Sequence, residues 1–209
     1  MAEDDQELAS RGVERLIFFS DAVVAIAITL LAIDLPVPQG DNVRQFWSSV
    51  QDNDGHYAAF LISFAVIAAS WGGHHDLFRY ATRMDPRLRL LNTAWLMMIV
   101  LNPFATRLLT ANAQEALDVH ALGFGFYALL QLLASACLYA MLRHMTAYLE
   151  TTGAPRPAVS SMAWQCIDLM LGFGVSIPLF FVTGYAWLLW IIVPPVAGRR
   201  RHRIRETTQ

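Results

Sequence analysis

The segment RLIFFSDAVVAIAITLLAIDLPVP, residues 15–38, decides the fold class of this chain. Residues 16–37 are mainly apolar, and about 20 such residues are enough for a helix to cross the hydrocarbon core of a bilayer. Arg15, Ser20 and Asp21 stand at the start of the run. Because a charge inside a membrane is costly unless it is paired or functional, these three residues require partners or a role.

The remaining sequence repeats this apolar pattern. The chain of 209 residues is 56% hydrophobic and 15% charged, against about 25% charged residues in an ordinary soluble domain. The pattern predicts an all-α integral membrane protein without a pair of repeated halves. We expect one domain with six transmembrane helices at about residues 16–37, 57–78, 88–109, 122–142, 161–176 and 178–196. The polar segment 39–56 is expected to be a loop.

The boundary between the last two expected spans depends on residues that break helices. Residues 161–196 are too many for one span and just enough for two short ones. Gly172, Gly174 and Pro178 favour a break there, with Ser176 as a cap and Pro178 in the first turn of the next helix. A break at residues 183–184 is the alternative, and it would leave a very short last helix.

Arginine sets the expected orientation, because all 15 basic residues are arginine. If both ends of the chain lie on one side, that side receives thirteen arginines, five of them in the tail, and the other receives only Arg44 and Arg107. The positive-inside rule then places residues 1–14 and the basic tail 198–209 in the cytoplasm. The acidic N-terminus lacks the features of a secretory signal, so the first span is expected to be retained. A basic tail beside an apolar span favours this reading over nucleic-acid binding.

The sequence contains no pattern typical of an enzyme. A Walker loop, a nucleophile elbow and a pair of catalytic carboxylates are all missing, so we expect neither catalysis nor a cofactor. His74 and His75 are adjacent rather than at the i, i+4 spacing of a helical metal site, which argues against a bound metal. Cys137 and Cys166 offer no disulfide framework.

Two GFG triplets, at residues 123–125 and 172–174, invite comparison with the filter of ordinary potassium channels. Such filters are built from T-V-G-Y-G loops. Here both triplets lie inside apolar spans without a preceding Thr-Val, so we interpret them as glycines that let helices approach closely.

Four residues after Asp21 share one face of the first span. Ile26, Leu30 and Ile33 recur at helical spacing, and Thr29 lies beside them. The ordinary interpretation is that this face packs against lipid or other helices. The alternative is that copies of the face from several subunits form a hydrophobic constriction that gates by dewetting, with the Thr29 hydroxyls as a polar layer.

The same segment resembles a known family. RLIFFSDAVVAIAITLL fits the R-x-x-x-F-S-D signature of the transmembrane protein 175 family of potassium channels through Arg15, Phe19, Ser20 and Asp21. The resemblance continues through SFAVIAASWGGHHDLF and LLNTAWLMMIVLNPFATRLL in the next two spans. The chain length is similar to that of the prokaryotic branch, which carries one six-helix repeat.

The resemblance implies a homotetrameric potassium channel without a P-loop, in the bacterial inner membrane, with the first helix of each subunit lining the pore. Ile26 would be the main constriction, Thr29 the hydroxyl layer, and Leu30 and Ile33 further apolar rings. Potassium ions would pass near Ile26 and Thr29 without a resident metal, and would be favoured over sodium.

The resemblance also assigns a packing role to the polar residues of the motif. Arg15, Ser20 and Asp21 would form a network with Trp71 and with His74 or His75 of the second span. They would hold the first helix in place rather than contact the ion.

Two other functions stay open from the residues alone. A proton-coupled membrane transporter would use His74, His75 and Asp168 as relay residues. A non-conducting interaction protein would use its arginine tail to dock a partner or anionic lipid.

Overall fold

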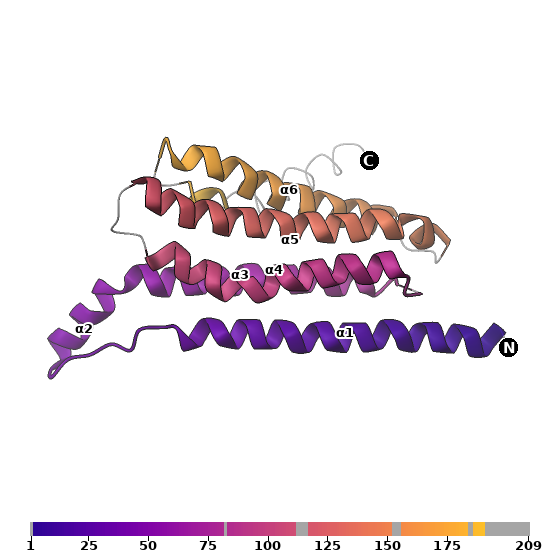
Figure 1. The fold of residues 1–209 in the computed structure, drawn as a ribbon, viewed down its shortest axis with the longest axis horizontal. Coiled ribbons are helices and arrows are strands. Elements are labelled where there is room, and N and C mark those ends of the chain that lie inside the picture. The colour runs from indigo at the N-terminus through magenta and orange to yellow at the C-terminus, as the bar shows by residue number, and fades with distance from the viewer. Residues whose placement is uncertain (1, 82, 112–116, 152–155, 184–185, 191–209) are drawn as a thin grey trace.

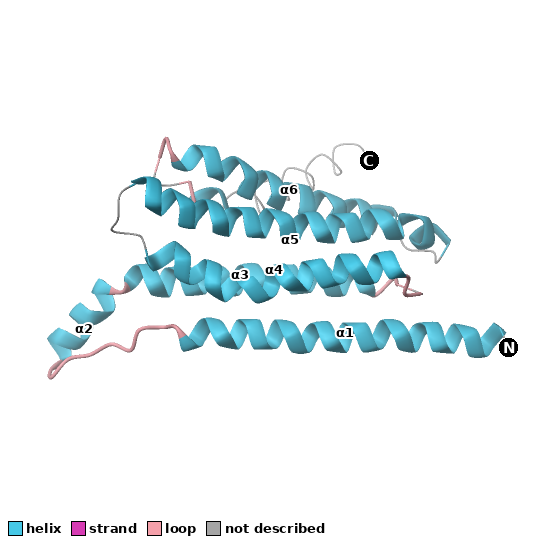
Figure 2. Ribbon diagram, in the orientation of Figure 1, coloured by secondary structure: helices cyan, strands magenta, loops and turns pink. Residues whose placement is uncertain are grey.

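Each long apolar run is helical in the computed structural model, which describes residues 2–81, 83–111, 117–151, 156–183 and 186–190. The helices are α1 (Ala2–Ile33), α2 (Val43–Asp52), α3 (Asp54–Phe78), α4 (Pro86–Ala111), α5 (Leu117–Thr151) and α6 (Arg156–Phe180). Figure 2 shows helices joined by loops, and these described ranges contain no strand.

Five of the described helices are long and apolar enough to cross a membrane. The spans are Arg11–Ile33, Asp54–Phe78, Pro86–Ala111, His120–Thr146 and Val159–Phe180. Large apolar side chains remain exposed on all five, including Ile26, Leu61, Val100, Leu122 and Leu171. Because a water-facing surface seldom carries so much apolar area, the prediction of an all-α, multi-pass membrane protein is confirmed.

The long helices lie roughly side by side, as Figure 1 shows, with α1 on one flank, α3 and α4 in the middle, and α5 and α6 on the other flank. Helix α4 packs against α1, α3 and α5, and α6 packs against α5. The N-terminus lies at the end of the bundle opposite α2. We call the end that carries the N-terminus the inner end, and the end that carries α2 the outer end.

Two clusters of buried side chains hold the bundle together. One joins α1, α3, α4 and α5 around Ile67, Trp95 and Ile99, each 0% exposed. The other joins α4, α5, α6 and residues 186–190, where Trp190 stacks on Phe124 at a ring distance of 4.9 Å. Helix α1 therefore packs with the bundle along one side only.

The expectation of a loop over residues 39–56 is wrong, because α2 lies within it. Asn42 caps this helix: its side-chain oxygen accepts a 3.0 Å hydrogen bond from the backbone N–H of Gln45. Apolar residues at Val43, Phe46 and Trp47 give the short helix one apolar side, and they are 42 to 74% exposed. Because the segment is polar overall, the helical spacing of these three apolar residues was not recognised in the sequence.

The first span ends earlier than expected, at Ile33 rather than at residue 37. Pro36 and Pro38 explain the difference, since a residue that precedes proline is disfavoured in the helical region. Asp34 and Leu35 form the turn that ends the helix, and Asp34 thus follows directly after the last residue of the apolar stripe.

The expected break between Ser176 and Pro178 is wrong as well, because α6 continues through Pro178 to Phe180. Proline is tolerated inside transmembrane helices where neighbouring groups compensate for the missing N–H. Pro178 lacks the N–H that would bond the Gly174 carbonyl. In the same turn the Ser176 hydroxyl donates to the Phe173 carbonyl at 2.7 Å and accepts from the Trp190 indole at 2.9 Å, which ties this part of α6 to residue 190. The described chain turns only after residue 180, and part of the expected sixth span, at 184–185 and 191–196, lies outside the described residues.

Candidate pore-lining helix and its anchor

One face of α1 is buried in the bundle and the opposite face is open. Val24, Ala27 and Leu31 are 1 to 4% exposed, at the spacing of three and four residues that defines one side of a helix. The predicted stripe occupies the other side: exposed side chains at Ile26, Leu30, Ile33 and Thr29. No charged residue lies between Asp21 and Asp34.

Thr29 supplies the polar group on this open face. Its hydroxyl donates a 2.8 Å hydrogen bond to the Ile26 carbonyl one turn earlier. The proton is thereby committed to the helix backbone, and the oxygen lone pairs remain available on the exposed side. Such an oxygen can coordinate a cation but adds no charge.

Asp21 is held to α3 by two neighbours. The Trp71 indole N–H donates to Oδ1 of Asp21 at 2.8 Å, and Nε2 of His75 lies 2.8 Å from the same oxygen. Trp71 and His75 are one helical turn apart, so both reach the carboxylate from one side of α3. This arrangement compensates for the charge of Asp21 within the membrane.

Ser20 is held by a second, fully buried set of contacts. The Asn92 amide of α4 donates to the Ser20 hydroxyl at 3.1 Å, while its oxygen lies 2.7 Å from Nε2 of His74. Because an amide oxygen only accepts, Nε2 of His74 carries a proton. His74 is also stacked between Trp95 and Phe78, at ring distances of 4.4 and 4.3 Å. We call these contacts of Ser20 and Asp21 the inner anchor.

The structure brings together five of the seven residues predicted for the motif network and leaves two outside it. Within the described chain, Arg15 is exposed and forms no hydrogen bond or ion pair. Phe19 is 61% exposed on the side of α1 that does not pack on the bundle. Asn92 was missed from the sequence, although an amide inside the apolar run LLNTAW was the available signal.

The relay proposed for a transporter does not form one cluster. Asp168 is buried on α6, which packs against α5, whereas His74 and His75 face α4 and α1 from α3. In the part of the chain that the structure describes, no group of three or more His, Cys, Asp or Glu side chains is placed to hold a metal ion.

Gly123 of the first GFG triplet lies where two helices approach closely. A Cβ atom at this position would come within 2.5 Å of the Leu108 carbonyl oxygen on α4. At Gly125 the same added atom would meet nothing within 4 Å. Of these two glycines, only Gly123 is required by packing.

Known proteins similar to this chain are named ion channels. Residues 15–103 match the family described as endosomal/lysosomal potassium channel TMEM175. A protein of Streptomyces collinus named a potassium channel is 32% identical over 167 residues, covering 79% of this chain and 81% of that protein. A protein of Chamaesiphon minutus, also named a potassium channel, is 41% identical over 114 residues, or 51% of this chain and 56% of the other.

Animal relatives match a shorter part. The cattle protein named endosomal/lysosomal proton channel TMEM175 is 31% identical over 113 residues, covering 50% of this chain and 24% of its own length.

Solved structures extend the likeness to nearly the whole chain. The crystal structure of a lysosomal potassium-selective channel TMEM175 homologue from Chamaesiphon minutus has a TM-score of 0.73 and 28% identity, covering 92% of this chain and 98% of that one. A variant of the potassium channel MtTMEM175 has a TM-score of 0.62 at 18% identity, covering 90% and 93%, which shows a shared fold. The chain therefore belongs to the TMEM175 family, a family of ion channels and not of enzymes.

Proposed function

We propose that this protein is a potassium-permeable cation channel whose pore is lined by α1. Its relatives in Streptomyces and Chamaesiphon are named potassium channels, and the family match begins at Arg15, within α1. The observation that carries the proposal is the open, uncharged face of α1 between Asp21 and Asp34. A cation passing along it would meet apolar rings and hydroxyl oxygens but no fixed charge.

The apolar stripe supplies the gate and the selectivity element. Ile26 forms the main constriction, and Leu30 and Ile33 form further rings toward the outer end. A narrow apolar ring closes to ions when water leaves it, so small changes in its width change conduction strongly. Thr29, one turn after Ile26, offers the oxygen layer nearest to that constriction.

One chain cannot enclose this pore, because its open face needs partners. We propose a homotetramer in which four copies of α1 surround the axis and close the rings. The structural likeness to the Chamaesiphon channel over 98% of that chain supports a shared assembly. The cytoplasmic side is the inner end, since Arg79, Arg83, Arg87 and Arg89 flank the connection between α3 and α4 there.

The positive-inside pattern also favours an even number of spans. With five described spans, a sixth after α6 returns the arginine tail to the side of the N-terminus. We place the channel in the bacterial inner membrane, because its full-length relatives of similar size are bacterial.

The pore assignment is tested by a polar substitution in the main ring. In liposomes with an outward potassium gradient, Ile26→Asn is expected to raise potassium flux several-fold, because a polar ring stays wet. Leu61→Asn is the matched control, since Leu61 has a similar exposure of 63% on α3. Equal flux in wild type and Ile26→Asn, or equal effects of the two substitutions, would contradict the assignment.

Protons are a second candidate ion, because the animal relatives carry the name proton channel. A pH gradient across liposomes free of potassium and sodium separates the two. Dissipation of the gradient through the wild-type protein at a rate matching potassium flux would favour proton conduction. A gradient that persists while potassium passes freely would favour the potassium channel.

A further inference from the structure

The outer end of α1 is held in a different way from the inner anchor. Directly after Ile33, the carboxylate of Asp34 lies 3.4 Å from the guanidinium of Arg107 on α4. The Asp34 side chain is 31% exposed and that of Arg107 is 68% exposed. Among the described residues, this pair is the one charged contact between the outer end of α1 and α4.

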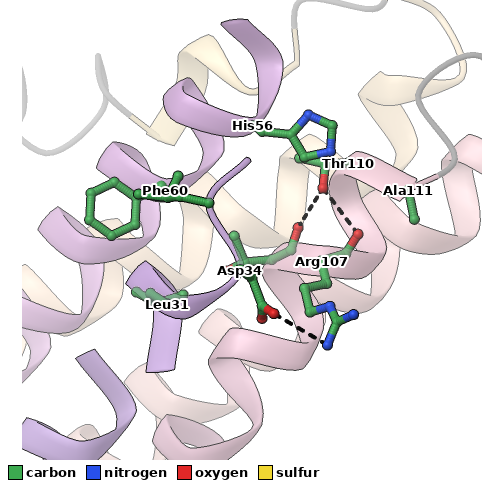
Figure 3. Close-up of a pocket in the computed structure, with 9 residues that line it drawn as sticks. Leu31, Asp34, His56, Phe60, Arg107, Thr110 and Ala111 are labelled. Atoms are coloured by element: carbon green, nitrogen blue, oxygen red, sulfur yellow. Dashed lines mark hydrogen bonds and ion pairs between the residues drawn. The ribbon is translucent and has the colours of Figure 1, made fainter. Parts of the chain in front are cut away.

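A cavity of about 260 Å³ lies beside this ion pair. Figure 3 shows Asp34 and Leu31 of the α1 end, His56 and Phe60 of α3, and Arg107 and Thr110 of α4 arranged around it. Asp34, His56 and Arg107 are exposed, so this is a hollow open to the surface and not a void inside the bundle. The ion pair therefore stands at an open edge of the bundle, whereas Val24, Ala27 and Leu31 further along α1 are buried.

The other polar link at this end does not reach α4. The Tyr57 hydroxyl donates to the Pro36 carbonyl at 2.8 Å and so ties the chain after α1 to α3. The Asp34–Arg107 pair thus gives this end of α1 a polar contact with α4, and Leu31 is buried one turn before Asp34.

We propose that Asp34 and Arg107 form an outer latch that holds the outer half of α1 against α4 and keeps the rings at Leu30 and Ile33 apart. The inference rests on the proposed function, in which these rings line the pore. Apolar rings that face each other across a narrow aqueous mouth gain free energy by closing on one another. The latch opposes that closure from behind the helix.

Because the inner anchor fixes α1 near Asp21, the latch affects residues of α1 more strongly the further they lie from Asp21. Asp21 and Asp34 are thirteen residues apart, which corresponds to about 20 Å along a helix. A tilt of α1 about the anchor displaces Ile33 more than Ile26. Asp34 and Arg107 are thus positioning residues: they act on the ion through α1 and do not contact it.

The test neutralises each charge separately and then exchanges the positions of the acidic and the basic residue. Asp34→Asn and Arg107→Gln are compared with the double variant Asp34→Arg/Arg107→Asp for potassium flux in liposomes. Because an exposed ion pair is weak, we expect each single variant to lower flux about threefold, and the double variant to recover at least half of the loss. Arg44→Gln is the matched control, since Arg44 is another exposed arginine at the outer end.

A second readout reports the position of α1 without any ion flux. Ile33→Cys is introduced into the same variants with Cys137 and Cys166 replaced by serine, and its rate of modification by a charged thiol reagent is measured. Loss of the latch should slow modification about threefold, and the reversed pair should restore it. If the reversed pair behaves no better than the single variants, or if these behave as Arg44→Gln does, the latch is wrong. Absence of potassium flux in wild type would instead refute the proposed function, while the modification rates would still test the latch.

Discussion

The indole N–H of Trp71 on α3 donates a 2.8 Å hydrogen bond to the carboxylate of Asp21 on α1. This contact joins the first and second membrane spans near the inner end. Nε2 of His75 meets the same oxygen, so the charge of Asp21 has two partners. The carboxylate at the start of the apolar stripe is therefore bonded to α3, and the stripe beyond it is exposed.

Loss of the indole donor should loosen this attachment. Trp71→Phe keeps an aromatic ring but removes the hydrogen bond to a charged group, a change that costs about 1.5 to 3 kcal/mol in folded proteins. We expect a lower melting temperature for the purified protein in detergent. Trp47→Phe on α2, where Trp47 is 59% exposed, serves as the control and should melt as wild type does. Equal melting of Trp71→Phe and wild type would remove Trp71 from the anchor.

Asn92 should matter more than its neighbour on the helix. Asn92→Leu leaves the Ser20 hydroxyl and the Nε2 proton of His74 buried without partners, and each unsatisfied group costs about 1 to 3 kcal/mol. The expected result is a large loss of thermal stability. Thr93→Val removes a hydroxyl from the exposed side of the same turn and should change little. Similar melting curves for these two variants would refute the role of Asn92.

Asp85 should stabilise the inner end in a manner that depends on pH. Partial burial raises the pKa of Asp85, but hydrogen bonds from the Leu88 N–H at 2.8 Å and from His144 at 2.7 Å outweigh it and lower the pKa overall. A lowered pKa means that the stabilisation is fully present above the unfolded value of about 3.9 and is lost as the pH falls further. Melting of wild type and Asp85→Asn between pH 3 and 7 measures it.

At neutral pH, Asp85→Asn should be less stable by about 1 kcal/mol, because the hydrogen bonds from the Leu88 N–H and from His144 lose a charged acceptor. The difference should shrink below about pH 4, as the native carboxylate is protonated. A difference that stays constant down to pH 3 would show that the charge of Asp85 contributes nothing.

The two glycines of the first GFG triplet should respond in opposite directions. Gly123→Ala places a Cβ within 2.5 Å of the Leu108 carbonyl oxygen, and such overpacking costs about 1 to 3 kcal/mol. Gly125→Ala meets nothing within 4 Å and should stabilise the helix by up to about 1 kcal/mol. Unfolding of both variants by heat, compared with wild type, decides the matter. A stable Gly123→Ala would mean that α4 and α5 do not approach closely there.

Five membrane spans could be predicted from the sequence, because a bilayer demands runs of about 20 apolar residues, whatever their partners. The side of α1 that faces outward was readable for a similar reason, since helical spacing alone puts Ile26, Leu30 and Ile33 together. The length needed to cross a bilayer and the period of a helix both leave their pattern within one segment, so the residues of that segment are enough to predict them.

Features that depend on a distant partner were not readable in this way. Pro178 suggests a break, but Ser176 and Trp190 support a continuous helix at that point, and Trp190 lies on the far side of a turn. The contact of Asn92 with Ser20 joins residues 72 positions apart. Arg15 shows the converse. The motif groups it with Ser20 and Asp21, but within the described chain Arg15 is exposed on α1 and does not join their contacts.

The most direct test of the central claim is the reversal potential of purified protein in a planar bilayer, with potassium chloride on one side and sodium chloride on the other. If the protein is a cation channel that favours potassium, we expect a measurable current that reverses toward the potassium equilibrium potential. The same current should change in amplitude in Ile26→Asn and stay unchanged in Leu61→Asn. No current, or a current that reverses at the chloride or the sodium equilibrium potential, would contradict the proposal that α1 lines a potassium-permeable pore.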